Sequence, residues 1–292
     1  MVVTSGLTPF LPLSIRWSGG EAKPAAPSPQ IEMLPKSRVS VKEGNGVSDP
    51  RQVLDQLGIE PKKSLGQNFM VELAALNRLA DAADLKPGDA VLEIGAGLGA
   101  LTAVLAGRVR RVVALEIEGR LVSYLRQRFA EQPSVEIVPG DVLETDPAAL
   151  MGRDAGGYKV VANVPYYITS AILRHLLESA APPRLLVVTV QKEVAERITA
   201  GPGAMSLLAV SVQFYGQPRI VARLKRGHFY PPPDVDSAIV RIDPHPGGPL
   251  LPPEETARFF EVARAGFSQP RKQLRNSLAA GLGVDAGTAV RW

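Results

Sequence analysis

Four consecutive residues near the middle of the chain, Asn163-Val164-Pro165-Tyr166, combine a carboxamide, a fixed backbone turn and an aromatic ring. An exocyclic amine on an aromatic ring is a poor nucleophile, because its lone pair is delocalised. The Asn163 carboxamide oxygen and the carbonyl of Val164 or Pro165 can each accept one amine hydrogen and so aim the lone pair at a methyl donor. The proline fixes the chain direction there. The segment therefore predicts methyl transfer to a planar amine.

Tyr166 adds a ring face on which a base turned out of its stack can lie, an interaction worth about 1–3 kcal/mol. A sulfonium methyl group is already activated, so its transfer depends mainly on positioning. The chain offers no Ser-His or Cys-His constellation, which fits a reaction without a strong base. An ordinary Asn-x-Pro turn with Tyr166 in the core is the alternative explanation.

A glycine-rich segment, Glu93-Ile94-Gly95-Ala96-Gly97-Leu98-Gly99, follows a short apolar run. Gly95 and Gly97 permit a tight strand-to-helix turn and let backbone N–H groups approach a ligand closely. Glu116 follows about 20 positions later, where its carboxylate can accept hydrogen bonds from both hydroxyls of a ribose. Because NAD-dependent dehydrogenases and methyltransferases share these features, they predict a cofactor that contains adenosine and leave both classes open.

Two later strand ends separate these classes. Gly140-Asp141 brings a carboxylate that can accept from an adenine amine, although a simple turn explains the same pair. Asn163-Val164-Pro165-Tyr166 follows the next strand, and hydride transfer has no use for this segment. The dehydrogenase is therefore the weaker hypothesis, which tight binding of NAD without S-adenosylmethionine would revive.

The composition indicates a globular protein with one sizeable α/β domain and a smaller addition. The 292 residues are 45% hydrophobic and 21% charged, and the formal charge of +4 suits a nucleic-acid partner without requiring one. The absence of cysteine excludes disulfides and thiolate metal sites, and the three histidines lack metal-ligand spacing, so no metal is expected. No apolar run approaches the roughly 20 residues of a membrane span, and we expect a cytoplasmic protein.

Alternating strand and helix patterns predict the elements that position these residues. We expect a mostly parallel seven-stranded sheet, covered by helices on both faces, with strands at 90–94, 111–116, 135–138, 159–162, 185–190, 209–214 and 237–242. Each chemical segment above follows one of these strands.

The chain divides into three predicted parts. Residues 1–48 are rich in Pro, Gly and Ser without a regular period, which predicts a disordered or weakly ordered extension. Residues 49–245 form the α/β domain. In residues 246–292 the strand patterns stop, and helical patterns with many basic residues predict a small helical domain.

In combination, these motifs resemble the ribosomal RNA adenine dimethyltransferases over roughly residues 53–282. Further matches are Ser64-Leu65-Gly66-Gln67-Asn68-Phe69, Gln191-Lys192-Glu193-Val194-Ala195 and Phe229-Tyr230-Pro231-Pro232-Pro233 with Val235-Asp236-Ser237. The resemblance implies a Rossmann-like class I methyltransferase. Its expected reaction is dimethylation of two adjacent adenosines in the 3′-terminal hairpin of small-subunit rRNA, as part of ribosome biogenesis.

The resemblance also implies roles for individual residues. S-adenosylmethionine would contact Asn68, Met70, Gly95, Gly97, Glu116, Asp141 and Asn163. The catalytic set would comprise Asn163, Pro165, Tyr166 and Phe229, with the Phe229 ring against the target adenine opposite Tyr166. The rRNA and the immature 30S subunit would meet a monomeric enzyme through Lys62, Lys63, Lys225, Arg226, Arg271, Lys272 and Arg275.

Some features depart from the family pattern. Asp234 stands where family members usually carry a basic residue, and the segment before Phe229 is more basic than typical. The helical domain is expected to be incomplete at Trp292. Two other functions stay open: dimethylation of one large-subunit rRNA adenine, as in macrolide resistance, and a ribosome-assembly factor with secondary methylation. Leu65-Gly66-Gln67-Asn68 and Val235-Asp236-Ser237 favour the small-subunit enzyme.

Overall fold

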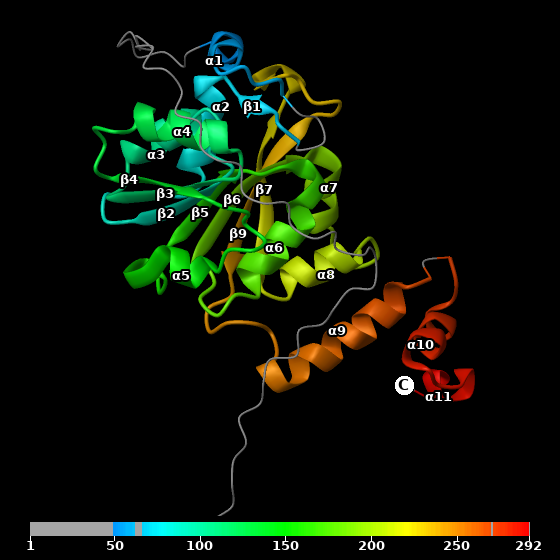
Figure 1. Ribbon diagram of the computed structural model, residues 1–292. Coiled ribbons are helices and arrows are strands. Elements are labelled where there is room, and N and C mark those ends of the chain that lie inside the picture. Colours follow the sequence, from blue (N-terminus) through cyan, green and yellow to red (C-terminus); the bar gives the residue numbers. More distant parts are fainter. Residues whose placement is uncertain (1–48, 62–65, 270, 292) are drawn as a thin grey trace, which may run out of the picture. The chain divides into compact units, whose positions relative to one another are not determined.

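A seven-stranded sheet forms the centre of the computed structural model, which describes residues 49–61, 66–269 and 271–291 (Figure 1). The strand order is β4-β3-β2-β5-β6-β9-β7. The first five strands in this order are parallel, and β9 pairs antiparallel with both β6 and β7, so the mostly parallel sheet is as predicted. The strands are β2 (Ala90–Ile94), β3 (Arg111–Glu116), β4 (Val135–Pro139), β5 (Lys159–Asn163), β6 (Leu185–Gln191), β7 (Gly216–Leu224) and β9 (Ser237–Pro244).

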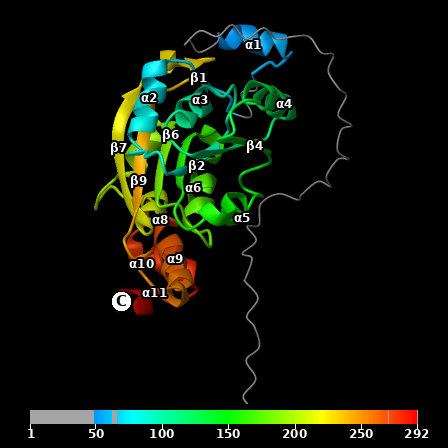
Figure 2. The ribbon, with the colours of Figure 1, turned by 90° about the vertical axis from the view of Figure 1, so that its left-hand side faces the viewer.

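Helices cover both faces of this sheet, as Figures 1 and 2 show. Successive side chains of a strand point to opposite faces, so Val112 and Ala114 join one core cluster while Val113 and Leu115 join the other. The first cluster takes side chains from α1 (Pro50–Gln56), α2 (Leu73–Asp81), α3 (Ala100–Ala106) and α4 (Gly119–Arg128). The second takes them from α5 (Pro147–Met151), α6 (Thr169–Leu177), α7 (Lys192–Ile198) and α8 (Leu207–Gln213).

A second, two-stranded sheet joins two motifs that are far apart in the sequence. β1 (Phe69–Met70) pairs antiparallel with β8 (Phe229–Tyr230), with Phe69 opposite Tyr230 and Met70 opposite Phe229. The Val71 N–H extends the pairing by donating to the His228 carbonyl at 2.9 Å. This small sheet fixes the Asn68 segment relative to the proline-rich segment that follows Phe229.

The strand predicted at 209–214 is wrong, because these residues lie in and just after helix α8. Their alternation of small and apolar residues resembles a strand, but Ala209 and Val212 are buried at helical spacing. The Ser206 hydroxyl caps the helix by accepting from the Ala209 N–H at 3.3 Å.

The seventh strand is instead β7, at the edge of the sheet. Pro218 lies inside this strand, which an edge position tolerates because one side of the strand needs no N–H donor. Arg219 and Arg223 point away from the core, and a bulge at Val221 interrupts the register. A charged, bulged edge strand has little of the apolar pattern that identifies buried strands.

Three helices follow the sheet: α9 (Pro253–Phe267), α10 (Leu274–Leu282) and α11 (Ala286–Val290). Phe259 and Phe260 anchor α9 on Phe214, with ring centroids 4.8 and 4.9 Å away. A side chain at Gly281 of α10 would lie 2.5 Å from the Ala265 Cβ atom, so only glycine allows this close packing of α10 on α9. The predicted domain boundary at 245 stays a prediction. Within the described ranges, no helix is long and apolar enough to cross a membrane.

Candidate active site at the carboxyl ends of the parallel strands

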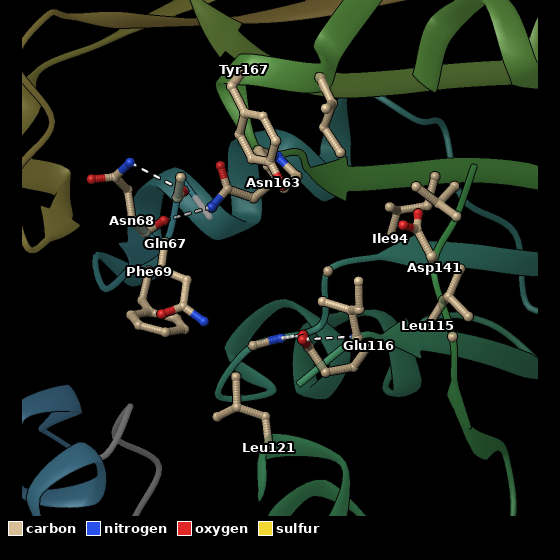
Figure 3. A pocket seen from close by; sticks show the side chains of 18 residues that line it. Gln67, Asn68, Phe69, Ile94, Leu115, Glu116, Leu121, Asp141, Asn163 and Tyr167 are labelled. Carbon is tan, nitrogen blue, oxygen red and sulfur yellow. Dashed lines mark hydrogen bonds between the residues drawn. The ribbon is translucent and has the colours of Figure 1, made fainter. Parts of the chain in front are cut away.

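A cavity lies where the carboxyl ends of β2, β3 and β5 and the turn after β4 meet (Figure 3). This is the position at which open α/β sheets bind ligands. The predicted cofactor residues Asn68, Gly95, Gly97, Glu116, Asp141 and Asn163 all line it. Met70 lines instead an adjoining, smaller cavity that shares Gly95, Gly97 and Asn163 with the first.

The glycine loop between β2 and α3 needs its glycines for two reasons. Gly95, Gly97 and Gly99 have φ values of +71°, +58° and +75°, a region that side chains strongly disfavour. A Cβ atom on Gly97 would also lie 3.0 Å from the Phe69 ring. The loop therefore passes close to the Phe69 segment and leaves its backbone open to the cavity.

Glu116 contributes a buried carboxylate to the lining of the cavity at the end of β3. Its Oε2 atom accepts from the Gly97 N–H at 2.8 Å, and its Oε1 atom accepts from the Ile117 and Glu118 N–H groups at 2.9 and 3.0 Å. Burial raises the pKa of Glu116, although these N–H groups oppose the change. Since each carboxylate oxygen can accept two hydrogen bonds, Oε2 retains capacity for a ligand hydroxyl.

Asp141 lies beside an apolar wall of the same cavity, formed by Ile94, Leu115 and Val142 (Figure 3). The Leu143 N–H donates to the Asp141 Oδ1 atom at 2.9 Å, which orients the carboxylate. An acceptor next to an apolar wall is a suitable environment for a flat base with an exocyclic amine.

Asn163 is held in one orientation by the Asn68 segment. Its Nδ2 group donates to the Asn68 carbonyl at 2.9 Å, and the Asn68 Nδ2 group donates to the Gly66 carbonyl at 3.2 Å (Figure 3). A carbonyl only accepts, so the nitrogen of the Asn163 amide must face Asn68. The Asn163 Oδ1 atom is buried and has no hydrogen-bond donor among the described residues. Because buried acceptors are rarely left unpaired, this oxygen indicates where a ligand donor belongs.

Tyr166 and Phe229 do not line the cavity, although Pro165 does. The Tyr166 hydroxyl lies 2.6 Å from the Ser237 hydroxyl, and burial raises the pKa of Tyr166 to about 12. Phe229 is only 3% exposed and packs in the same core cluster as Met70. Their contact with a target base stays a prediction.

Other residues line the cavity although the predicted site omits them. Gln67 lies just before β1 and Phe69 is the first residue of that strand, while Tyr167 lies next to Asn163 with 60% of its surface exposed (Figure 3). Tyr167 directly follows the Asn163–Tyr166 segment, and this position in the sequence is the signal that could have identified it as a cavity residue. The closeness of Phe69 to the glycine loop has no local signal, because it depends on the pairing of β1 with β8.

Glu93 faces the smaller cavity from β2 and is 1% exposed. Burial raises the pKa of Glu93 to about 8, against the opposing effect of hydrogen bonding from Thr102. Its Oε2 atom has no hydrogen-bond partner in the part of the chain that the structure describes. The same part contains no cluster of His, Asp and Glu side chains suited to a metal ion.

The predicted RNA-binding residues fall into three places. Lys225 and Arg226 lie just before β8, where Lys225 pairs with Asp236 at 3.1 Å. Arg271, Lys272 and Arg275 are exposed around the start of α10. Lys62 and Lys63 lie outside the described residues.

Comparison with known proteins identifies the family of this site. The family model described as "Ribosomal RNA adenine dimethylase" matches residues 59–290. The chain belongs to this family. By this membership the chain is an rRNA adenine dimethyltransferase, a class that agrees with the predicted methyl transfer to a planar amine.

Curated relatives of this rRNA adenine dimethylase carry a more specific name. The ribosomal RNA small subunit methyltransferase A of Dehalococcoides mccartyi is 46% identical over 238 residues, which cover 82% of this chain and 81% of that one. The protein of the same name from Pelotomaculum thermopropionicum is 44% identical and covers 80% of this chain and 82% of its own length.

Solved structures agree with the predicted class I methyltransferase fold. The 23S rRNA methyltransferase ErmE has a TM-score of 0.62 and 31% identity, over 75% of this chain and 92% of that one. A dimethyladenosine transferase from Plasmodium falciparum has the same TM-score and 28% identity, over 74% of this chain and 77% of that one.

Proposed function

We propose that the chain transfers methyl groups from S-adenosylmethionine to N6 of two adjacent adenosines in the 3′-terminal hairpin of small-subunit rRNA. The buried, unpaired Oδ1 atom of Asn163 is the observation that carries the proposal, because it needs a donor such as an adenine amine. The small-subunit target is supported by relatives of that name at 44–46% identity, against 31% for the 23S rRNA enzyme.

S-adenosylmethionine fits the donor set of the cavity. Glu116 retains an acceptor for a ribose hydroxyl, and Asp141 lies beside an apolar wall that suits an adenine ring. The absence of side chains at Gly95 and Gly97 leaves room for close approach of the cofactor to the backbone. When bound, S-adenosylmethionine supplies an activated methyl group on its sulfonium.

Asn163 and its neighbours would orient the target amine. The Asn163 Oδ1 atom would accept one hydrogen, and the Asn68 carbonyl keeps the amide from rotating. The Pro165 carbonyl already accepts from the Ile168 N–H and the Thr169 hydroxyl, at 3.4 and 3.3 Å. The Val164 carbonyl is therefore the better second acceptor, and two acceptors would aim the nitrogen lone pair at the methyl group.

The same proposal assigns the partners and the location. The substrate would be an immature 30S subunit, and its rRNA phosphates would contact the exposed cations around the start of α10. We propose that the enzyme acts as a monomer in the cytoplasm, where its substrate is assembled.

The direct test is incubation of the protein with labelled S-adenosylmethionine and small subunits that lack the methyl groups, followed by mapping of the label. We expect label on two adjacent adenosines of the 3′-terminal hairpin. Label on large-subunit rRNA instead would favour the macrolide-resistance activity, which the likeness to ErmE makes the second candidate. A folded protein that binds S-adenosylmethionine and labels neither RNA would contradict both.

Replacement of Asn163 tests the mechanism. We expect Asn163→Ala to lower kcat about 10²–10³-fold, the effect of removing one oriented hydrogen-bonding group from an active site. Asn163→Asp should also be impaired, because a carboxylate cannot donate to the Asn68 carbonyl. Asn77, which accepts from Arg108 on the far side of α2, provides the matched control Asn77→Ala. Steady-state methylation at saturating cofactor and subunit measures kcat, and equal values for Asn163→Ala and Asn77→Ala would refute the assigned role.

A further inference from the structure

His228 and Glu72 make a contact that no part of the proposed mechanism uses. The His228 Nε2 atom lies 2.7 Å from the Glu72 Oε2 atom. Glu72 immediately precedes α2 and His228 immediately precedes β8, so the contact lies beside the small β1–β8 sheet. The side chain of His228 is 19% exposed and that of Glu72 is 49% exposed.

Two acceptors face the ring of His228. Its Nδ1 atom lies 2.8 Å from the Lys225 carbonyl, which can only accept. Its Nε2 atom faces the Glu72 carboxylate on the other side of the ring. The ring is therefore held between the segment before β8 and the residue before α2.

A continuous series of contacts runs from this ion pair to Asn163. The backbones of Val71 and His228 are hydrogen-bonded at 2.9 Å, and β1 then pairs with β8. Asn68, directly before β1, supplies the carbonyl that holds the Asn163 amide. The position of that carbonyl thus depends on the closed β1–β8 pair, which is only two residues long on each side.

We propose that the contact between Glu72 and His228 acts as a latch that keeps β1 paired with β8 and thereby holds the Asn68 carbonyl against Asn163. His228 is a positioning residue in this scheme, and its role in methyl transfer rests on the proposed function.

The neighbouring charged groups have partners of their own. Lys225 and the Arg226 backbone are both bound to Asp236, at 3.1 and 3.2 Å. On α1, the guanidinium of Arg51 lies over the Tyr230 ring, 5.0 Å from its centroid. Each of these groups therefore has a contact other than the His228 ring.

Substitution of Glu72 tests the latch through activity. The Glu72 side chain forms no capping hydrogen bond to α2, so replacing it removes no helix cap. We expect kcat of Glu72→Ala to be about fivefold below that of the unaltered protein, a small factor because the contact is half-exposed.

Glu72→Gln keeps the contact without the carboxylate, because the introduced amide can either accept from or donate to the His228 Nε2 atom. We therefore expect kcat of Glu72→Gln to be close to that of the unaltered protein. No deficit in Glu72→Ala, or an equal deficit in Glu72→Gln, would overturn the latch.

Hydrogen exchange tests the latch without cofactor or RNA. We expect Glu72→Ala to increase the exchange rate of the 69–71 amides about fivefold and to leave β2 and β3 unchanged. The matched control is Glu178→Ala, which breaks the Arg174–Glu178 ion pair (3.0 Å) at the end of α6. Equal exchange in Glu72→Ala and Glu178→Ala would refute the latch, whereas faster exchange in an inactive protein would refute only the proposed function.

Discussion

Glu93 and Asn163 each keep a buried side-chain oxygen without a donor in the described part of the chain, and each lines a cavity beside the glycine loop. Folded proteins pair nearly all their buried polar atoms. At the scale of single residues, these two unpaired oxygens therefore lower the free energy of unfolding. A bound ligand with suitable donors can offset this loss.

The pH dependence of stability tests this cost at Glu93. Its carboxyl group binds a proton more tightly in the folded chain (pKa about 8) than when unfolded (4.5), because burial disfavours the charge. Stability therefore decreases as pH rises from about 4.5 to about 8, by at most about 1.4 kcal/mol per pH unit.

Glu93→Gln replaces the neutral acid with an uncharged side chain of the same shape. We expect this variant and the unaltered protein to have similar melting temperatures near pH 5, and the variant to melt at a higher temperature above pH 8. Thermal unfolding across this range provides the measurement. A constant separation between the two curves would show that Glu93 does not titrate in this way.

Residues at strand ends could be predicted individually, but contacts between distant segments could not. Glu116, Asp141 and Asn163 each follow an apolar run, and the type of each side chain indicates which hydrogen-bonding group of a ligand it can bind. The bond from Asn163 to the Asn68 carbonyl depends on how two segments pack, and a backbone carbonyl leaves no trace in residue identity.

At the scale of elements, the buried strands were predictable and the edge strand β7 was not. β2, β5 and β6 are mostly apolar, because parallel strands are covered on both faces. The edge strand β7 carries charges and a proline, while the helix α8 beside it has the apolar content of a strand. In both elements, the position in the folded sheet determines the secondary structure, and the local sequence pattern does not reveal that position.

Gly99 tests how tightly the loop and α3 are positioned on α4. Its φ value is +75°, and a Cβ atom there would lie 2.7 Å from the Phe129 ring and 2.8 Å from Leu125. We expect Gly99→Ala to lower the free energy of unfolding by about 1–3 kcal/mol. Gly119→Ala is the control, because its Cβ meets no atom within 4 Å at the start of α4. Urea titration measures both, and equal stability of the two variants would contradict the argument.

At the scale of the whole molecule, the cations around the start of α10 are well separated in sequence from the cavity residues. Arg271, Lys272 and Arg275 are exposed, and α9 contacts Phe214 at the end of α8 through Phe259 and Phe260. We predict that these three cations bind rRNA phosphates. Composition alone does not distinguish such a binding surface from a solvated helix surface.

Salt dependence distinguishes the two explanations. If these three cations bind phosphates, replacing all of them with alanine should weaken binding to unmethylated small subunits and reduce the salt slope by about 1 per lost contact. Lys86→Ala with Arg126→Ala removes exposed charges elsewhere as a control. Filter binding from low to moderate salt measures the slope, and an unchanged slope would indicate a merely solvated surface.

The single orientation of the Asn163 amide also bears on the release of product. Adenosine presents two amine hydrogens to the Asn163 oxygen and the Val164 carbonyl, a singly methylated base presents one, and a doubly methylated base presents none. In the proposed reaction, the hold on the base therefore weakens with each transfer. Completion of the second methylation removes the last donor, so departure of the finished nucleotide is favoured without any movement of the protein.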